Sequence, residues 1–385
     1  MFSTKFSIEQ IYHLMKKKVR HVIGISGGKD SGALGIYLKD KYPSLDVEYY
    51  FTDTGKELQE TYNLIKNLES YLGKTVNKLE AANKSNEDPF DHYYKLFGGY
   101  LPSSNARWCT KKLKLEPFEN YVGDDYVISY VGIRGDEDRE GYISKKPNIQ
   151  SIFPFRRNIW SEDVIAKVLN NANIKLILGY YKSTVDADKF QRIEEIVIEP
   201  ISVKFLQVQK LNALLDLGIK EFNKVVYQFI KEKTDYPLAH TDEFPLIDNE
   251  DILVRDDIFR ILRESGVGVP EYYEKIKFEV DGKVGEYARS RSGCYFCFFQ
   301  QKIEWVWLLE NHPEKFKLAT KYENEKEGFT WNQHESLKDL AHPNRVAQIK
   351  RDFLNRKEKE KSAKSPYLID ILDDTESGSC ISCFI

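Results

Sequence analysis

The chain has 385 residues, of which 41% are hydrophobic and 30% charged, and its formal net charge is −3. This length suffices for one large α/β domain with an appended region, and the composition is that of a soluble globular protein. With so small a net charge, contact with nucleic acid requires a local basic face, and no stretch of sequence is long and apolar enough to span a membrane. Five cysteines, an odd number, and an N-terminus without a signal-peptide pattern predict a reducing, cytoplasmic location.

The first predicted elements lead into a phosphate-binding loop. An amphipathic helix is expected over residues 7–18, and residues 21–25 are apolar and β-branched, as a buried parallel strand requires. The adjacent Gly27 and Gly28 allow a sharp turn whose amides can approach an anion. A helix is expected over residues 30–42, so its N-terminus would also point at the anion.

The loop itself reads SGGKDS, with the Lys29 ammonium beside the backbone donors. It is not the GxxxxGK[ST] loop of common NTPases, because the spacing of the glycines and the lysine differs. The alternative is an ordinary glycine turn, which a match of six specified residues between strand and helix disfavours. The residues expected to hold phosphates are Ser26, Gly27, Gly28, Lys29, Asp30 and Ser31.

Strands and helices continue to alternate after this loop. Strands are expected over residues 46–52, 75–79 and 126–133, and a long helix over residues 58–72. Such alternation implies a parallel sheet with right-handed crossovers. The polar segments 26–31, 52–55 and 134–139 would then all lie at the carboxyl ends of strands, where loops build the site of such folds.

Beyond about residue 158 the pattern is mostly helical, with helix starts expected at residues 160–164 and 255–262, whereas residues 170–247 carry no chemical motif. The predicted division is a nucleotide-binding α/β domain over residues 1–158, an insertion over 159–247, a helical cysteine-containing region over 248–350, and a charged tail over 351–385.

Two further segments place charged groups near the predicted loop. Asp53 follows a strand and can bind Mg²⁺ or the ribose of a nucleotide, and the alternative is a strand-end Asx turn. Arg107 and Lys111 flank Cys109, where cations favour a thiolate and can hold a polyphosphate or a nucleic-acid backbone. The lysines of this segment can equally lie on the solvent-exposed face of an ordinary helix.

The remaining cysteines lie in two CxxC pairs. Cys294 and Cys297, together with Cys109, supply three soft ligands, for which zinc, an iron–sulfur cluster, a redox pair and chance all remain open. The C-terminal pair, Cys380 and Cys383, is either a mobile arm or incidental. A basic patch with two tryptophans lies near the first CxxC pair and is suited to binding nucleic acid. Tryptophans in such a position are, however, more often part of a hydrophobic core. The patch comprises Arg289, Arg291, Lys302, Trp305 and Trp307.

The motifs together resemble the phosphoadenosine phosphosulfate reductase branch of the PP-loop ATP pyrophosphatases. The resemblance covers SGGKDS (26–31), FTDTG (51–55), RWCTKKLKLEP (107–117), GIRGDEDREGY (132–142) and SGCYFCFFQ (292–300). The terminal CISCFI differs from the catalytic tail of the assimilatory reductases, and sulfurylase small subunits do not require the three cysteines. The pattern is most similar to the sulfur-transfer subunits of DNA phosphorothioation (DndC-like).

This resemblance implies a nucleotide α-hydrolase-like α/β fold with a parallel sheet and a mostly helical C-terminal region. It also implies ATP and Mg²⁺ at the loop, and a 4Fe-4S cluster on Cys109, Cys294 and Cys297 with zinc as the alternative. The fourth cluster ligand stays open, because Trp108 stands where some relatives have a second cysteine.

The implied reaction is ATP-dependent sulfur transfer. An acceptor, most simply a DNA backbone phosphate, is adenylylated with release of pyrophosphate, and sulfur from a donor such as a cysteine desulfurase then displaces AMP. Lys29, Asp30 and Asp53 would serve the nucleotide, and Arg134, Asp136 and Arg139 the acceptor. A tRNA thiolase, a sulfate-activating or sulfate-reducing enzyme, and a nucleotide-sensing module of a defence complex are the rival functions. Other subunits of a modification complex are expected as partners. No association with a membrane is expected.

Overall fold

The computed structural model describes residues 18–138, 144–332 and 335–362. All but the last residue of the helix expected over residues 7–18 lies outside these ranges, and so do Arg139 and the pair Cys380 and Cys383. Within them, no helix is both long enough and apolar enough to cross a membrane.

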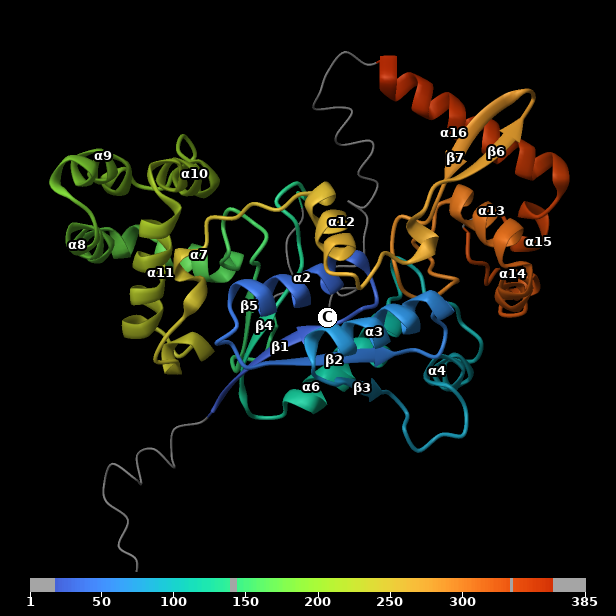
Figure 1. Cartoon of the computed structure of the whole chain (residues 1–385), viewed down its shortest axis with the longest axis horizontal. Coiled ribbons are helices and arrows are strands. Elements are labelled where there is room, and N and C mark those ends of the chain that lie inside the picture. The colour runs from blue at the N-terminus through green and yellow to red at the C-terminus, as the bar shows by residue number, and fades with distance from the viewer. Residues whose placement is uncertain (1–17, 139–143, 333–334, 363–385) are drawn as a thin grey trace, which may run out of the picture.

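A five-stranded parallel sheet forms the centre of the molecule (Figure 1). Its strand order is β3-β2-β1-β4-β5, so the order reverses between β1 and β4. In such sheets, ligands bind at the carboxyl ends of the strands at this point of reversal. The strands are β1 (Val19–Gly24), β2 (Val47–Asp53), β3 (Val76–Glu80), β4 (Tyr126–Tyr130) and β5 (Ile149–Ile152).

Helices cover both faces of the sheet. The helices α2 (Lys29–Lys41), α3 (Gln59–Leu72) and α12 (Arg255–Glu264) pack on one face, and α6 (Glu116–Val122) packs on the other (Figure 1). The alternation of β1 explains this, because Ile23 faces the large core under α2 while Val22 packs with Phe118 of α6.

The rest of the chain forms two groups of elements at opposite ends of the sheet (Figure 1). Beside β5 lie α7 (Glu162–Val168), α8 (Ile174–Thr184), α9 (Ala187–Ile198), α10 (Gln207–Leu217) and α11 (Ile219–Lys233). At the other end lie α4 (Pro89–Leu96), the hairpin β6 (Ile276–Val280) and β7 (Lys283–Tyr287), α13 (Lys302–Asn311), α14 (Pro313–Thr320), α15 (Leu337–Leu340) and α16 (Pro343–Ser362). Between α4 and α6 the chain forms α5 (Trp108–Thr110) and a π-helix (Lys111–Leu115).

The α/β fold, the parallel sheet and the helical C-terminal region are as predicted, and three details differ. The strand expected over residues 126–133 ends at Tyr130, and β5 and the β6–β7 hairpin were not predicted. The four residues of β5 are too few for a recognisable period, and the hairpin depends on a turn at Asp281, whose φ is +50°. The boundary predicted after residue 350 falls inside α16.

Candidate functional site

The loop of residues 26–31 follows β1 directly and opens α2, as its sequence predicts. Gly27 has a φ of +72°, in the left-handed region that favours glycine. Gly28 is the N-cap of α2, and the loop is tied internally by Ser31, whose hydroxyl accepts from Ser26 N–H at 3.1 Å. The loop therefore holds a defined shape at the N-terminus of a 13-residue helix.

Gly27→Ala tests how tightly this shape is specified. A Cβ at Gly27 would lie 2.2 Å from Thr61 Cγ2, in addition to the cost of the positive φ. Gly73 is the matched control, because its φ is +67° and nothing lies within 4 Å of an added Cβ. Gly73→Ala is expected to cost about 1 kcal/mol of unfolding free energy, and Gly27→Ala at least about 2 kcal/mol, measured by urea denaturation.

The clash can be isolated with a second change at Thr61. Thr61→Ser removes the methyl group that the new Cβ would meet. The double variant should therefore recover a large part of the loss seen in Gly27→Ala. Equal costs at Gly27 and Gly73, with no recovery, would contradict this description of the loop.

An ion-pair network joins the β1 and β4 loops across the point of strand reversal. The Lys29 ammonium lies 3.0 Å from Asp30 Oδ2, and the Arg134 guanidinium lies 3.0 Å from Asp30 Oδ1. The same guanidinium pairs with Asp136 at 2.8 Å and Glu137 at 2.7 Å. Lys29, Asp30 and Arg134 are all buried, so the pairs are weakly screened by solvent. Of the predicted site residues, Lys29, Asp30, Arg134 and Asp136 are thus brought together.

Residues far along the chain cover this loop. The Tyr272 hydroxyl donates to the Gly27 carbonyl at 2.8 Å, and the Lys29 backbone N–H donates to the Tyr273 hydroxyl at 3.4 Å. Ser292 Oγ lies 2.5 Å from the place of a Cβ on the second glycine of the loop. The segment that contains the CxxC pair therefore packs directly on the predicted phosphate loop, although more than 240 residues separate them.

Asp53 forms the end of β2 and is fully engaged by neighbouring groups. Its carboxylate accepts from Gly55 N–H at 2.8 Å and from the Tyr62 hydroxyl at 2.9 Å, and it pairs with Lys78 at 2.8 Å. Burial alone would raise the pKa of Asp53, but the hydrogen bonds from Lys78 and Gly55 outweigh it and hold the pKa below its usual value. The Gly55 contact is the Asx turn that the sequence left as the alternative to a Mg²⁺ ligand.

Glu57, which sequence reasoning did not select, is a buried acid beside Asp53. Burial, reinforced by the negative charge of Asp53, raises the pKa of Glu57 to about 7. The Thr54 hydroxyl donates to Glu57 Oε1 at 2.7 Å. A carboxyl with this pKa can hold or release a proton near neutral pH, which is the property of a general acid or base. No spacing in the sequence distinguishes Glu57 from a surface glutamate.

Glu57→Gln is expected to change the pH dependence of stability. Because the pKa rises from 4.5 in the unfolded chain to about 7 in the folded one, the stabilising protonated form is complete below pH 4.5 and is lost as the pH rises to 7. Glutamine resembles that form at every pH. The variant should therefore gain stability over wild type between pH 4.5 and 7, reaching about 3 kcal/mol above pH 7. The difference in unfolding free energy between variant and wild type is measured by urea denaturation from about pH 4 to about pH 8.5, in steps of about 0.5 pH unit. A difference that does not change with pH would contradict the raised pKa.

Cys294 and Cys297 lie in one turn, in which the Cys297 N–H donates to the Cys294 carbonyl at 3.2 Å. Cys109 and Cys294 both pack against the core of the C-terminal region, and the Cys294 backbone bridges to Glu57. Cys294 Sγ lies 3.2 Å from Thr54 Oγ1. Burial and the Glu57 carboxylate raise the pKa of the Cys294 thiol well above its usual value, so without a bound metal ion this thiol stays protonated.

Among the side chains that the structure describes, no group of three or more His, Cys, Asp or Glu is placed to hold a metal ion. The cluster, zinc and Mg²⁺ remain predictions from the sequence.

Two predicted nucleotide-binding residues lie apart from the loop. Arg107 is exposed, and its guanidinium lies 5.1 Å from the centre of the Phe299 ring next to the CxxC pair. Lys111 is exposed in the π-helix that follows. Among the described residues, no hydrogen bond or ion pair joins either side chain to residues 26–31.

Three of the five residues of the proposed nucleic-acid patch are buried. Trp305 and Trp307 are buried in the core of the C-terminal region, as the commoner interpretation expected. Arg289 is also buried, and Lys302 pairs with Glu335 at 2.6 Å. The sequence placed these residues close together but could not show that the first arginine points inward.

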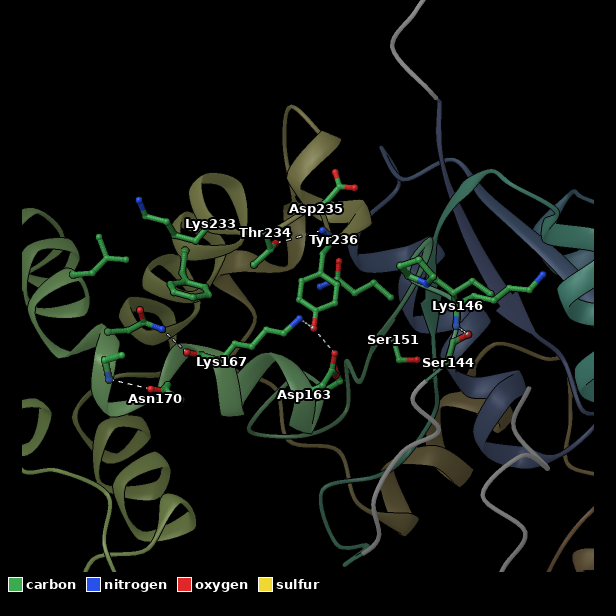
Figure 2. A pocket seen from close by; sticks show the side chains of 18 residues that line it. Ser144, Lys146, Ser151, Asp163, Lys167, Asn170, Lys233, Thr234, Asp235 and Tyr236 are labelled. Atoms are coloured by element: carbon green, nitrogen blue, oxygen red, sulfur yellow. Dashed lines mark hydrogen bonds between the residues drawn. The ribbon is translucent and has the colours of Figure 1, made fainter.

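A separate cavity of about 1110 Å³ lies between β5 and the helices α7 and α11 (Figure 2). In it the Lys167 ammonium donates to the Tyr236 hydroxyl at 2.7 Å, and that hydroxyl donates to Asp163 (Figure 2). Neither the loop of residues 26–31 nor any cysteine lines this cavity. It is therefore distinct from the candidate site at the carboxyl ends of β1, β2 and β4.

Fold and site together define an α/β domain with a glycine-rich loop at the point where the strand order reverses. Comparison with known proteins shows which families this domain resembles. Residues 20–176 match the family model of the phosphoadenosine phosphosulfate reductase domain, which is less than half of the chain. The match supports a place for this region among the PP-loop, phosphoadenosine phosphosulfate reductase-like domains. It spans the whole sheet, from β1 to the start of α8.

Individual relatives are similar over shorter stretches. The uncharacterized proteins MJ0066 and MJ0973 of Methanocaldococcus jannaschii are 32% identical over 159 residues and 28% identical over 211 residues, covering 38% and 50% of this chain. An uncharacterized nin region protein, ORF290, of Escherichia phage lambda is 26% identical over 172 residues, covering 38% of this chain. The matches span only 31%, 49% and 58% of those three proteins. A phosphoadenylyl-sulfate reductase structure from Candida auris aligns with a TM-score of 0.28 at 19% identity, covering 46% of this chain and 95% of that one.

Proposed function

We propose that this protein binds ATP on the loop of residues 26–31 and directs an acceptor to the α-phosphorus, so that the acceptor is adenylylated and pyrophosphate leaves. The observation that carries the proposal is the position of the loop, which follows β1, opens α2 and lies where the strand order reverses. Backbone N–H groups at a helix N-terminus, beside a lysine, suit the charge that develops on a pyrophosphate leaving group.

The domain match supports a sulfur-related second half of the reaction. In it a sulfur nucleophile attacks the adenylylated acceptor, a new bond to sulfur forms, the bond to AMP oxygen breaks, and no electrons are transferred. When the acceptor is a backbone phosphate of nucleic acid, with DNA favoured, the product is a phosphorothioate. The sulfur comes as hydrosulfide, which needs no further reactant. When a donor protein of the cysteine desulfurase class supplies it as a persulfide, the persulfide attacks first and a dithiol reductant then cleaves the S–S bond, so that two electrons from the dithiol release the phosphorothioate. No step is assigned to a metal cluster.

In the proposed reaction each site residue has a part. Lys29 and the loop amides bind the phosphates, and Asp30 fixes the Lys29 ammonium at 3.0 Å. Arg134 holds Asp30 from the β4 side, and Asp136 in turn accepts from the backbone N–H of Arg255 at 3.3 Å, which connects the loop to α12. Asp53 is a positioning residue, because it organises the turn after β2 rather than facing the loop directly.

Radiolabelled sulfide tests the proposed function. The protein is incubated with ATP, ³⁵S-sulfide and either duplex DNA or tRNA, and a parallel sample receives phosphoadenosine phosphosulfate with a dithiol reductant. ATP-dependent label in nuclease-resistant DNA dinucleotides is the expected result. Label in tRNA would replace DNA by tRNA as the acceptor, sulfite release would identify a reductase, and ATP binding without any product would indicate a nucleotide-sensing module.

A further inference from the structure

Arg289 is a buried guanidinium that forms no ion pair with any carboxylate of the described residues. Its side chain is 2% exposed and lies just after β7. One terminal nitrogen donates to the Cys294 carbonyl at 3.0 Å. Its Nε and its other terminal nitrogen are buried and have no hydrogen-bond partner among the described residues, where no ion pair of Arg289 is found either. A buried cation is tolerated when an anion accepts its unused donors.

The turn that carries Arg289 lies against the phosphate loop. The guanidinium carbon is 5.7 Å from the centre of the Tyr272 ring, and the hydroxyl of that ring donates to Gly27. Ser292, three residues further along, meets Gly28. The hydrogen bond from Arg289 to Cys294 closes this turn, and Cys294 contacts Thr54 at the end of β2. Arg289 therefore sits between the loops that follow β1 and β2.

We infer that Arg289 binds an oxyanion of the phosphate or sulfate class next to the Gly27–Gly28 loop. The inference rests on the proposed function, in which the loop amides hold the pyrophosphate of ATP. A guanidinium offers a planar pair of donors that matches two oxygens of one oxyanion, which an ammonium cannot do. The oxyanion belongs either to the nucleotide or to the second substrate, and the binding experiment below separates these two sources.

A purely structural role for Arg289 makes the opposite prediction for stability. If Arg289 served only to brace the turn through Cys294, Arg289→Met would lower the thermal midpoint and leave anion affinity unchanged. If it is an anion-binding residue, removing an uncompensated buried charge leaves the midpoint of the ligand-free protein equal or higher. The sign of this shift therefore separates the two roles.

The experiment measures binding of pyrophosphate, ATP and inorganic sulfate by calorimetry to wild type, Arg289→Met and Arg289→Lys. Arg260→Met is the matched control, because Arg260 is exposed on α12 and pairs with Asp257 at 2.7 Å. Arg289→Met is expected to weaken oxyanion binding about 10- to 100-fold, since a hydrogen bond to a charged group is worth about 1.5–3 kcal/mol. Arg289→Lys should recover part of the loss.

The three ligands separate the possible outcomes. Weaker binding of pyrophosphate and ATP assigns the oxyanion to the nucleotide, whereas weaker binding of sulfate alone assigns it to the second substrate. If wild type binds neither ATP nor pyrophosphate yet binds sulfate through Arg289, the proposed function fails and the inference on Arg289 stands. Unchanged affinity for all three ligands in Arg289→Met overturns the inference.

Discussion

Lys29→Met is expected to reduce pyrophosphate release from ATP about 100- to 1000-fold, the usual cost of removing one donor from a developing negative charge. The methionine keeps the buried stem of the lysine and removes only the ammonium that lies 3.0 Å from Asp30. Asp30 keeps its ion pair with Arg134, so the fold should survive the change. Pyrophosphate is measured by a coupled assay under saturating ATP, and urea denaturation confirms that the variant is folded.

Lys39→Met provides the control for Lys29→Met. Lys39 lies on the same helix, α2, but is exposed and stacks on Tyr71 at 4.6 Å from the ring centre. Its replacement should leave the rate within about twofold of wild type, because surface substitutions away from a site have small effects. Equal rates for wild type and Lys29→Met would remove the loop from the reaction.

Arg134→Met is expected to lower the free energy of unfolding by about 3–5 kcal/mol, because it leaves buried carboxylates without their cation. Arg134 is 0% exposed and pairs with Asp30, Asp136 and Glu137. Asp30 and Glu137 are buried as well, whereas Asp136 is partly exposed and loses less. The loss of stability is measured by urea denaturation at pH 7.

A second substitution separates charge from packing at this position. Arg134→Lys keeps the positive charge but lacks the planar guanidinium that reaches three carboxylates. It should therefore recover only part of the stability that Arg134→Met loses. Adding Glu137→Gln to Arg134→Met removes a buried negative charge that Arg134 no longer balances and should restore about 1–2 kcal/mol, whereas Asp30 keeps its ion pair with Lys29. A cost below about 1 kcal/mol for Arg134→Met would show that the network is not a major source of stability.

The sequence was most informative where residue type and local structure are tightly linked. The β-branched run of residues 21–25, the two glycines and the following helix start determine a strand, a loop and a helix without help from the rest of the chain. The three polar segments could be placed at one edge of the sheet because all strands are parallel, and the ion pair between Asp30 and Arg134 shows that two of these segments meet.

What the sequence did not predict depends on contacts between distant segments. Tyr272 and Arg289 are near the loop only because the C-terminal region folds back over it. Tyr272 stands in no recognisable motif, and Arg289 was assigned from the sequence to a basic patch rather than to the loop. Glu57 acquires its raised pKa from burial beside Asp53, which no spacing reveals. The cysteine motif was visible in the sequence, but the burial that raises the pKa of the Cys294 thiol depends on contacts with Thr54 and Glu57 far away in the chain.

The position at which ATP is cleaved tests the central claim most directly. Wild-type protein is incubated with ATP labelled at the α-phosphorus, together with DNA and sulfide, and the labelled products are separated by chromatography. Attack at the α-phosphorus predicts that all label released from ATP appears in AMP or in an adenylylated acceptor, with pyrophosphate as the partner product and loss of both in Lys29→Met. Label in ADP with release of orthophosphate would place the attack at the γ-phosphorus and contradict the account.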